Sequence, residues 1–212
     1  MSKARGTLRT ELRNLIGASS TGSSANPADT KLNSFLNLAA QDVQDEIEVL
    51  DENYFLETIE LFVAGADVSV GLPTGFRKLI DLWRVDGSNK IRLKHVDLRL
   101  RAEGMNADEK YRYYLSRNTI VYHRALDEDH TLRLDYIKNI AEIADANDTE
   151  TWPVPVIGDR LIVHRAAILY ITSENGETGG VAALYGELLQ KLPRVLQGRQ
   201  VQAPRTVNYY NK

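Results

Sequence analysis

The chain has 212 residues, of which 43% are hydrophobic and 26% charged, and its formal net charge at pH 7 is −3. A chain of this length can bury a sizeable core, and the absence of cysteine excludes a disulfide scaffold, a thiolate zinc site, an iron–sulfur cluster and a cysteine nucleophile. The first residues lack the apolar core of a secretory signal, and charged residues interrupt the most apolar stretch, residues 154–171. We therefore expect neither a signal peptide nor a membrane span.

Two helices are predicted in the N-terminal part of the chain. Leucines recur at the spacing of one helical face, which predicts a helix over residues 5–16 that Gly17 ends. Residues 17–26 are small and polar and indicate a flexible connection. An Asn-Pro dipeptide, typical of a helix start with Asn as the cap, then predicts a second helix over residues 27–50.

From Tyr54 the pattern changes to short stretches rich in β-branched and aromatic residues, separated by turn residues about every ten positions. This pattern predicts a module of short antiparallel strands, a small sandwich or barrel, over about residues 54–140. Residues 97–109 are expected to form a brief helical turn or an irregular loop. The predicted strands lie near residues 55–63, 68–70, 78–85, 90–94, 111–116, 119–124 and 131–137.

Helical spacing returns after a Trp-Pro-Val-Pro segment and predicts helices over about residues 158–173 and 178–192, the second ended or kinked by Pro193. Residues 197–212 are polar, basic and nearly without aliphatic side chains, which predicts an extended C-terminal tail. The expected fold class is α+β, a helical bundle made by the N-terminal and C-terminal helix pairs with the small β-module inserted between them. We expect residues 1–196 to form a single domain.

The net charge of −3 results from acidic and basic blocks along the chain whose charges largely cancel. Residues 28–60 carry nine acidic and one basic side chain, and residues 127–150 carry eight acidic and two basic ones. Residues 77–117 carry eleven basic and six acidic side chains, and residues 188–212 carry five basic and no acidic ones. Such blocks bear on the choice of partners and not on the fold.

No motif for common enzyme chemistry is present. The sequence lacks a phosphate-binding loop, a dinucleotide fingerprint, a hydrolase nucleophile elbow and an HExxH zinc motif. His123 and His130 flank three acidic residues and could converge on a divalent ion, but an acidic, solvated turn is the simpler interpretation. We therefore expect no catalytic residue, no cofactor and no metal site.

The C-terminal tail combines basic residues with a pair of tyrosines. Arg199, Arg205, Tyr209 and Tyr210 are of the residue types that supply most energy when a short segment docks on a partner. A segment of this length could also add as a strand to an exposed sheet edge. The alternatives are a disordered end with incidental tyrosines and a nucleic-acid-binding segment whose aromatic side chains stack on bases.

Several short patterns occur in an order that resembles a known family. The patterns are Leu8 to Gly17, Leu32 to Ala39, Gly71-Leu72-Pro73-Thr74-Gly75-Phe76-Arg77-Lys78-Leu79, Tyr113-Tyr114-Leu115, Thr119 to His123 and Thr131 to Tyr136. With an Ala-rich helical hairpin after them, they resemble the head-to-tail adaptor (connector or neck) proteins of tailed bacteriophages and prophage-like particles, over most of residues 7–190. Pro73 and Phe76 are interpreted as scaffold residues that start a strand.

The resemblance implies a structural virion protein without catalysis, assembled in the host cytoplasm. Proteins of this family form a ring, usually of twelve copies, beneath the portal protein, which encloses the DNA channel and offers a platform to a tail or nozzle protein. Genomic DNA would pass through the lumen without specific binding, and no membrane is involved. The alternatives are a tail terminator or another neck or tail completion protein and, from other classes, a nucleic-acid-binding module or a metal-dependent hydrolase.

The resemblance and the charge blocks together give two hypotheses about individual residues. The family uses a C-terminal extension to dock on the portal and on neighbouring adaptors, so Arg199, Arg205, Tyr209 and Tyr210 are the candidate docking residues. A DNA conduit should not bind phosphates, so we expect acidic residues to face the channel or the tail. The candidates are Asp45, Glu48, Asp127, Glu128 and Asp129.

Overall fold

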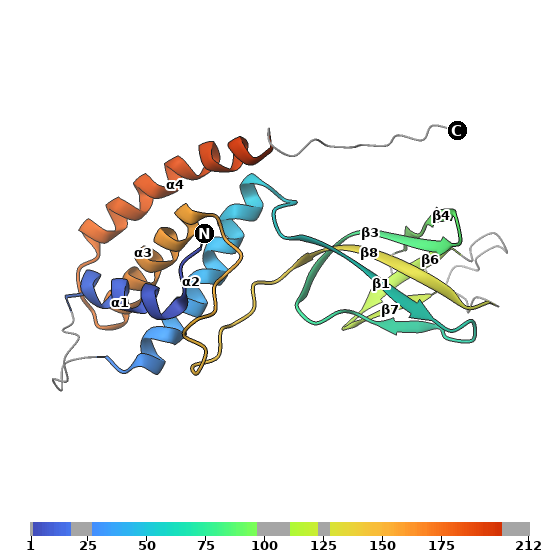
Figure 1. The fold of residues 1–212 in the computed structure, drawn as a ribbon, viewed down its shortest axis with the longest axis horizontal. Coiled ribbons are helices and arrows are strands. Elements are labelled where there is room, and N and C mark those ends of the chain that lie inside the picture. Colours follow the sequence, from blue (N-terminus) through green and yellow to red (C-terminus); the bar gives the residue numbers. More distant parts are fainter. Residues whose placement is uncertain (1, 18–26, 97–110, 123–127, 201–212) are drawn as a thin grey trace. The chain divides into compact units, whose positions relative to one another are not determined.

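The computed structural model describes residues 2–17, 27–96, 111–122 and 128–200 (Figure 1). Within these ranges the fold is α+β, with four helices and two sheets. The chain divides into two compact units. The helical unit comprises Met1–Tyr54 and Ile140–Lys212, and the β-unit is the inserted segment Phe55–Asn139.

The helical unit is organised around one central helix. Its helices are α1 (Arg5–Leu15), α2 (Asp29–Leu50), α3 (Val156–Ser173) and α4 (Gly179–Gln200). Helix α3 contacts each of the other three, which explains why it is apolar on most of its circumference. The core of this unit consists of fully buried aliphatic side chains, including Leu8, Leu12, Leu36, Ile47, Leu161, Ile162 and Leu192.

Several helix boundaries differ from those predicted, and α3, for example, begins at Val156, two residues earlier than expected. Helix α2 begins at Asp29 with Ala28 as its N-cap, two residues later than expected, and the predicted Asn cap lies outside the described residues. Helix α4 does not end near residue 192 but continues to Gln200 with Pro193 inside it. Leu192 and Leu196, on either side of the proline, are both buried, so tertiary packing maintains the helix where local preference would end it.

The β-unit contains two four-stranded sheets, and neither closes into a barrel within the described residues. The first sheet has the order β1-β8-β3-β4 and is antiparallel throughout. Its strands are β1 (Leu56–Val63), β8 (His130–Lys138), β3 (Phe76–Asp86) and β4 (Asn89–Arg92). The second sheet has the order β2-β7-β6-β5, with β2 (Ser69–Gly71), β7 (Thr119–Tyr122), β6 (Arg112–Ser116) and β5 (Lys94–His95).

The stretch expected as one strand over 90–94 is divided between the two sheets. Strand β4 ends at Arg92, Leu93 is buried and donates its N–H to the carbonyl oxygen of Leu82 at 2.9 Å, and β5 then pairs with β6. The β5–β6 pairing is parallel, so the expectation of antiparallel strands alone is wrong at this point. The chain therefore passes from one sheet to the other at Leu93.

Both sheets contribute to one hydrophobic cluster, which we call the β-core. From the first sheet it takes Val63, Leu82, Leu132, Leu134 and Tyr136, and from the second Tyr113, Ile120 and Tyr122, with Leu93 between them. Alternation along β8 buries every second side chain, as expected for a strand with one face against a core. The ring of Tyr136 stacks on that of Phe76 with centroids 5.8 Å apart, at the start of β3.

Candidate assembly surfaces

A polar network holds the segment between β8 and α3 to the rest of the helical unit. Arg5, the first residue of α1, is fully buried. Its Nη1 donates to the carbonyl oxygen of Ile143 at 2.7 Å, and its Nη2 donates to the carbonyl oxygen of Asp145 at 2.7 Å and to Oδ1 of Asp148 at 2.9 Å. Because a buried guanidinium requires acceptors, these bonds fix the segment against α1.

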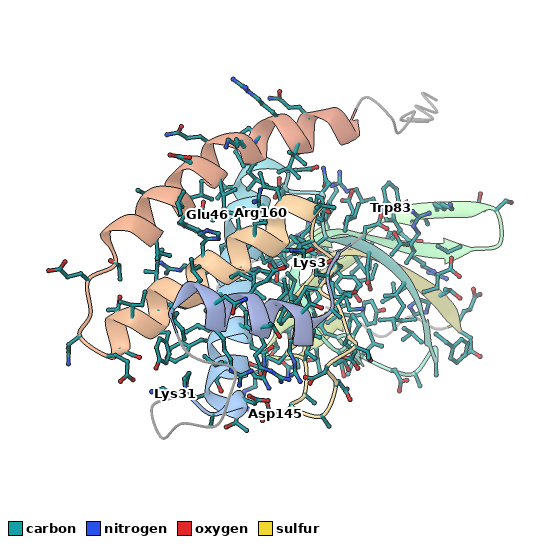
Figure 2. All side chains as sticks on the ribbon, turned by 60° about the vertical axis from the view of Figure 1, so that its left-hand side comes forward. Lys3, Lys31, Glu46, Trp83, Asp145 and Arg160 are labelled. Carbon is teal, nitrogen blue, oxygen red and sulfur yellow. The ribbon has the colours of Figure 1, made fainter. Side chains whose placement is uncertain are left out.

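The acidic residues of this segment have internal partners. The two Nη atoms of Arg9 donate to the two carboxylate oxygens of Asp148, at 2.9 and 2.6 Å. Hydrogen bonds from Arg9 and Arg5 hold the pKa of Asp148 below its ordinary value. The side chain of Asp145, labelled in Figure 2, accepts a hydrogen bond from Nδ2 of Asn33 at 2.9 Å. Part of the acidic block 127–150 therefore stabilises the fold itself.

Asp159 on α3 is a buried carboxyl group that the sequence analysis did not identify. Oγ of Ser2 donates to its Oδ1 at 2.6 Å, and the backbone N–H of Lys3 donates to its Oδ2 at 2.8 Å. Burial raises the pKa of Asp159, although both hydrogen bonds act in the opposite direction. The contact fastens the N-terminal residues to α3, and no local pattern could reveal a pair separated by 157 positions.

The C-terminal half of α2 carries the first two candidate acidic residues. Asp45 is exposed, and Glu48 is half-buried and accepts a hydrogen bond at 2.7 Å from a glutamine one turn earlier. Val49, beside them on the same helix, is 82% exposed. Asp42 instead accepts a hydrogen bond from Nε of Arg165 at 2.6 Å, which joins α2 to α3. The outer side of α2 therefore combines acidic with apolar side chains.

Glu128 and Asp129, directly before β8, are both exposed. Oδ1 of Asp129 accepts a hydrogen bond from the N–H of Gly65 at 2.9 Å, and Oε2 of Glu128 lies 3.8 Å from Nη2 of Arg84. Two of the three candidate acids in this part of the chain thus lie together on the surface of the β-unit. Asp127, the third, lies outside the described residues.

The histidines considered for a metal site have different surroundings. His130 is buried, with Nδ1 3.0 Å from the carbonyl oxygen of Glu128 and Nε2 3.3 Å from the hydroxyl oxygen of Tyr122. Both ring nitrogens therefore have partners inside the β-unit. His123 lies outside the described residues, and among those that are described no three His, Asp or Glu side chains gather as a metal site would require.

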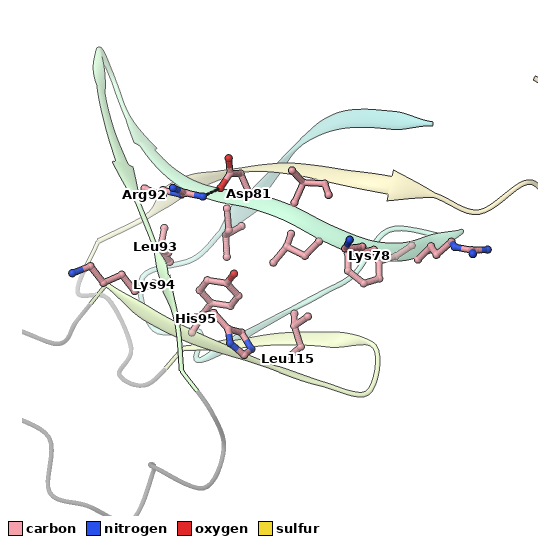
Figure 3. A pocket seen from close by; sticks show the side chains of 13 residues that line it. Lys78, Asp81, Arg92, Leu93, Lys94, His95 and Leu115 are labelled. Carbon is pink, nitrogen blue, oxygen red and sulfur yellow. Dashed lines mark ion pairs between the residues drawn. The ribbon is translucent and has the colours of Figure 1, made fainter. Parts of the chain in front are cut away.

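An open groove lies on the β-unit between β3, the β4–β5 crossover and β6 (Figure 3). Its volume is about 860 Å³, within the range of pockets that bind ligands or peptide side chains. Apolar side chains from both sheets line it, namely Phe76, Leu79, Leu82, Leu93, Tyr113 and Leu115. The groove therefore gives access to one flank of the β-core.

The polar lining of the groove is mostly basic. Arg77, Lys78, Lys94 and His95 are all exposed, and Asp81, the one carboxylate among the described lining residues, forms an ion pair with Arg92. Figure 3 shows this ion pair at one end of the groove and Lys78 at the other. These residues belong to the basic block 77–117, but a charge count does not predict that they surround a groove, because the groove forms only where the strands of both sheets meet.

The candidate docking residues lie at or beyond the end of the described chain. Arg199 belongs to the last turn of α4, so the basic segment leaves the helical unit from this helix. Arg205, Tyr209 and Tyr210 lie outside the described residues. None of the helices described is both long and apolar enough to cross a bilayer.

Comparison with known proteins identifies the family of the chain over most of its length. The family model described as SU10 adaptor protein matches residues 4–208, which include the helices and strands of both units and the C-terminal segment up to residue 208. No curated protein matches the chain. A protein of such a family is a structural component of the phage particle that contacts portal and tail components. The chain belongs to the SU10 adaptor protein family, the phage head-to-tail adaptors that its sequence motifs resemble.

Proposed function

We propose that this adaptor forms a ring, of twelve copies as is usual for such proteins, beneath the portal protein. The ring continues the DNA channel and offers a platform to the tail or nozzle protein. The observation that carries this proposal is the family match, which runs from residue 4 to residue 208 and so covers the elements of both units and is not confined to one of them. The two units then act together as one adaptor domain, residues 1–196, made and assembled in the host cytoplasm without any catalytic step.

The basic C-terminal segment is the proposed docking element. The proposed docking segment, residues 197–212, carries three basic and no acidic side chains, so it complements an acidic groove on the portal or on a neighbouring adaptor. Arg199, Arg205, Tyr209 and Tyr210 supply the charge and the aromatic anchors of this contact. Helix α4 provides the rigid base from which the segment extends.

The acidic candidates are proposed to face the channel or the tail. Asp45, Glu128 and Asp129 are exposed, as this role requires, and we assign Glu48 and Asp127 to the same surfaces. Carboxylates along the lumen repel the DNA backbone, so the genome does not adhere while it passes. A structure of the assembled ring with a basic lumen would contradict this assignment.

Deletion of residues 201–212 tests the docking role, because α4 ends before the deleted segment. The truncated chain should keep its thermal unfolding temperature but be missing from purified particles. A chain with Arg205, Tyr209 and Tyr210 replaced by alanine should behave in the same way, since it keeps the length of the segment. Normal incorporation of both variants would refute the docking role.

The mass of the assembled protein tests whether a ring forms. Native mass spectrometry of the 23.8-kDa chain, alone and mixed with its portal protein, should show a closed oligomer, with twelve copies as the expected number. A chain that stays monomeric in both samples and is still found in particles would be a neck component that forms no ring.

A further inference from the structure

Strand β1 is the longest terminal strand in the described part of the chain. It has eight residues, whereas the terminal strands β4, β2 and β5 have four, three and two. Its backbone pairs with β8 over all eight positions, and among the described residues no backbone group of β1 has a partner on its other side. A strand edge of this length can pair with another chain.

Strand β1 has few of the features that prevent such pairing. Its sequence, Leu-Glu-Thr-Ile-Glu-Leu-Phe-Val, contains no proline, lysine or arginine, and its register with β8 contains no bulge. Leu56 is 41% exposed and Phe62 is 69% exposed. The edge therefore combines unpaired backbone groups with apolar side chains that water still contacts, and both favour a second strand beside it.

The two faces of β1 have different surroundings. The side chains that pack against the β-core are those of Ile59, Leu61 and Val63. Because successive side chains of a strand point in opposite directions, the other face carries Leu56, Thr58, Glu60 and Phe62. A strand added at this edge would therefore meet apolar, hydroxyl and acidic groups on the outer face.

Glu60 is the acidic side chain of β1 that has no internal partner. Glu57 accepts hydrogen bonds from Nζ of Lys138 at 3.0 Å and from the hydroxyl group of Tyr136 at 3.1 Å. Glu60 is exposed and forms no hydrogen bond or ion pair with any residue that the structure describes. Its cross-strand neighbour on β8, Arg133, forms an ion pair with an aspartate of its own strand instead. Glu60 is therefore available to a basic side chain on a docked strand.

Residues 205–212 of the chain have the composition that this edge requires. They follow Pro204 and read Arg-Thr-Val-Asn-Tyr-Tyr-Asn-Lys, with four β-branched or aromatic residues, two basic residues and no acidic one. A strand of eight residues is about 27 Å long, which is the length that β1 offers. Residues 201–204 connect this segment to α4, which ends at Gln200.

An antiparallel arrangement matches the segment to the outer face of β1. Every second residue of the segment would share that face, beginning with its arginine. The matched pairs are Arg205 with Glu60, Val207 with Thr58, and Tyr209 with Leu56. These are an ion pair, a pair of β-branched residues and a contact between an aromatic ring and an aliphatic side chain, and such cross-strand pairs stabilise a sheet.

Two other occupants fit this edge less well. The β1 strand of a second copy carries the same two glutamates and no basic residue, so it cannot neutralise Glu60. A nucleic-acid backbone is negatively charged, and the edge would repel it. The charge of the edge therefore favours a basic strand of a protein.

We propose that residues 205–212 of one copy add to the β1 edge of a neighbouring copy as an antiparallel strand. The inference rests on the proposed docking role and names the surface of the neighbouring adaptor that receives the segment. The segment and the edge are different surfaces, so each copy donates one segment and receives one. A contact of this kind repeats head to tail from copy to copy and forms a ring when the rotation closes.

Disulfide cross-linking tests the predicted pairing, since the chain has no cysteine of its own. Full-length chains with Thr58→Cys and with Val207→Cys, each with a different tag, should form a covalent dimer after co-assembly and mild oxidation, because residues opposite each other in a sheet lie within disulfide distance. Lys90→Cys, at an exposed position of β4, is the matched control and should not cross-link to Val207→Cys. A chain that carries Thr58→Cys and Val207→Cys together should form covalent oligomers. A disulfide closed within single chains would show that the segment docks on its own copy and would overturn the inference.

A charge exchange in the full-length chain gives an independent test. Glu60→Arg and Arg205→Glu should each weaken association between copies about tenfold, measured by analytical ultracentrifugation under conditions in which the unmodified chain assembles. Combining the two substitutions in one chain should restore assembly, which unfolding of the chain by either substitution would not allow. Glu177→Arg, at an exposed position between α3 and α4, is the matched control and should assemble normally.

The outcomes separate this contact from the docking role itself. Assembly that neither charge substitution weakens, or the absence of the cross-link between chains, would overturn the β1 edge as the receiving surface. If the alanine variant of Arg205, Tyr209 and Tyr210 were still missing from particles, the docking role would stand with a different receiving surface. Normal incorporation of that alanine variant would overturn the docking role and this contact together.

Discussion

Replacement of Arg5 by methionine should strongly destabilise the helical unit. The guanidinium of Arg5 is fully buried and donates three hydrogen bonds, two to backbone carbonyl oxygens and one to Asp148. Methionine keeps the unbranched apolar stem but is three heavy atoms smaller, so the substitution removes the donors and the charge and leaves only a small void at the guanidinium position. The carbonyl oxygens of Ile143 and Asp145 would lose these donors.

The expected loss is about 3 kcal/mol in the free energy of unfolding. Removing one partner of a buried, hydrogen-bonded charge costs about 3 to 5 kcal/mol, and each buried acceptor without a partner costs about 1 to 3 kcal/mol. The loss should lie near the lower end of these ranges for two reasons. Asp148 keeps the forked pair with Arg9, and Nε of Arg5 has no hydrogen-bond partner among the residues that the structure describes.

The two tryptophans of the chain make the assay specific for one unit. Trp152 is buried in the helical unit and Trp83 belongs to the β-unit, so a Trp83→Phe background leaves a fluorescence probe of the helical unit alone. With a urea m-value of about 2 kcal/mol/M, the Arg5→Met substitution should lower the unfolding midpoint by about 1.5 M.

Arg13→Met is the matched control on the same helix. Arg13 pairs with Asp29, whose side chain is 52% exposed, so its removal should cost less than about 1 kcal/mol and move the midpoint by less than about 0.5 M. If Arg5→Met shifted the midpoint no further than Arg13→Met, the network around Arg5 would not hold the segment between β8 and α3.

Three other predictions concern the two units separately. The pKa of Asp148 lies below its ordinary value of 3.8, so the stabilisation from its ion pairs is complete above that pH and is lost as the pH falls further. Asp148→Asn should therefore weaken the fall of the thermal unfolding temperature at acidic pH. Pro193→Ala should stabilise the protein by about 1 kcal/mol and raise its unfolding temperature, measured by circular dichroism, because a proline inside a helix removes a helical hydrogen bond. A lower unfolding temperature would show that α4 needs the proline. Gly65→Ala should lower the free energy of unfolding of the β-unit by about 1 to 3 kcal/mol, because the added Cβ would lie 2.7 Å from the backbone of Glu128. Gly71→Ala, whose Cβ would meet no atom within 4 Å, should be nearly neutral, and equal losses in the two variants would contradict the steric argument.

Local patterns predicted which segments form helices and strands because these patterns arise from one element facing one core. The leucine spacing in α1 and the richness of the β1 stretch in β-branched and aromatic residues are of this kind. The split of the 90–94 stretch at Leu93 and the parallel β5–β6 pair depend on which sheet each short segment joins, and residues distant in sequence decide that. The continuation of α4 through Pro193 likewise depends on the burial of leucines on both sides of it.

For the candidate surfaces, too, local sequence predicted some features and missed those that depend on residues distant in the chain. Charge counting placed Asp45 and Asp129 in acidic blocks, and both are exposed. The same counting could not separate them from Asp148, whose arginine partners lie 139 and 143 positions away in the chain. The groove was not predicted either, because Lys78 and Leu115 line it together only after the two sheets have packed.

The insertion of the β-unit has a consequence for the order of folding. Strands β1 and β8 enter and leave this unit and pair along the whole of β1, from Leu56 with Ile137 to Val63 with His130. If the helical unit folded first, it would have to close an unstructured loop of about 85 residues, at an entropic cost of about 4 kcal/mol. If the β-unit folds first, the β1–β8 pair holds its two ends close together, and the N-terminal and C-terminal helix pairs are then separated by only a short effective connection. The β1–β8 pair should therefore form early, and slowing it should delay the collapse of helices that contain none of its residues.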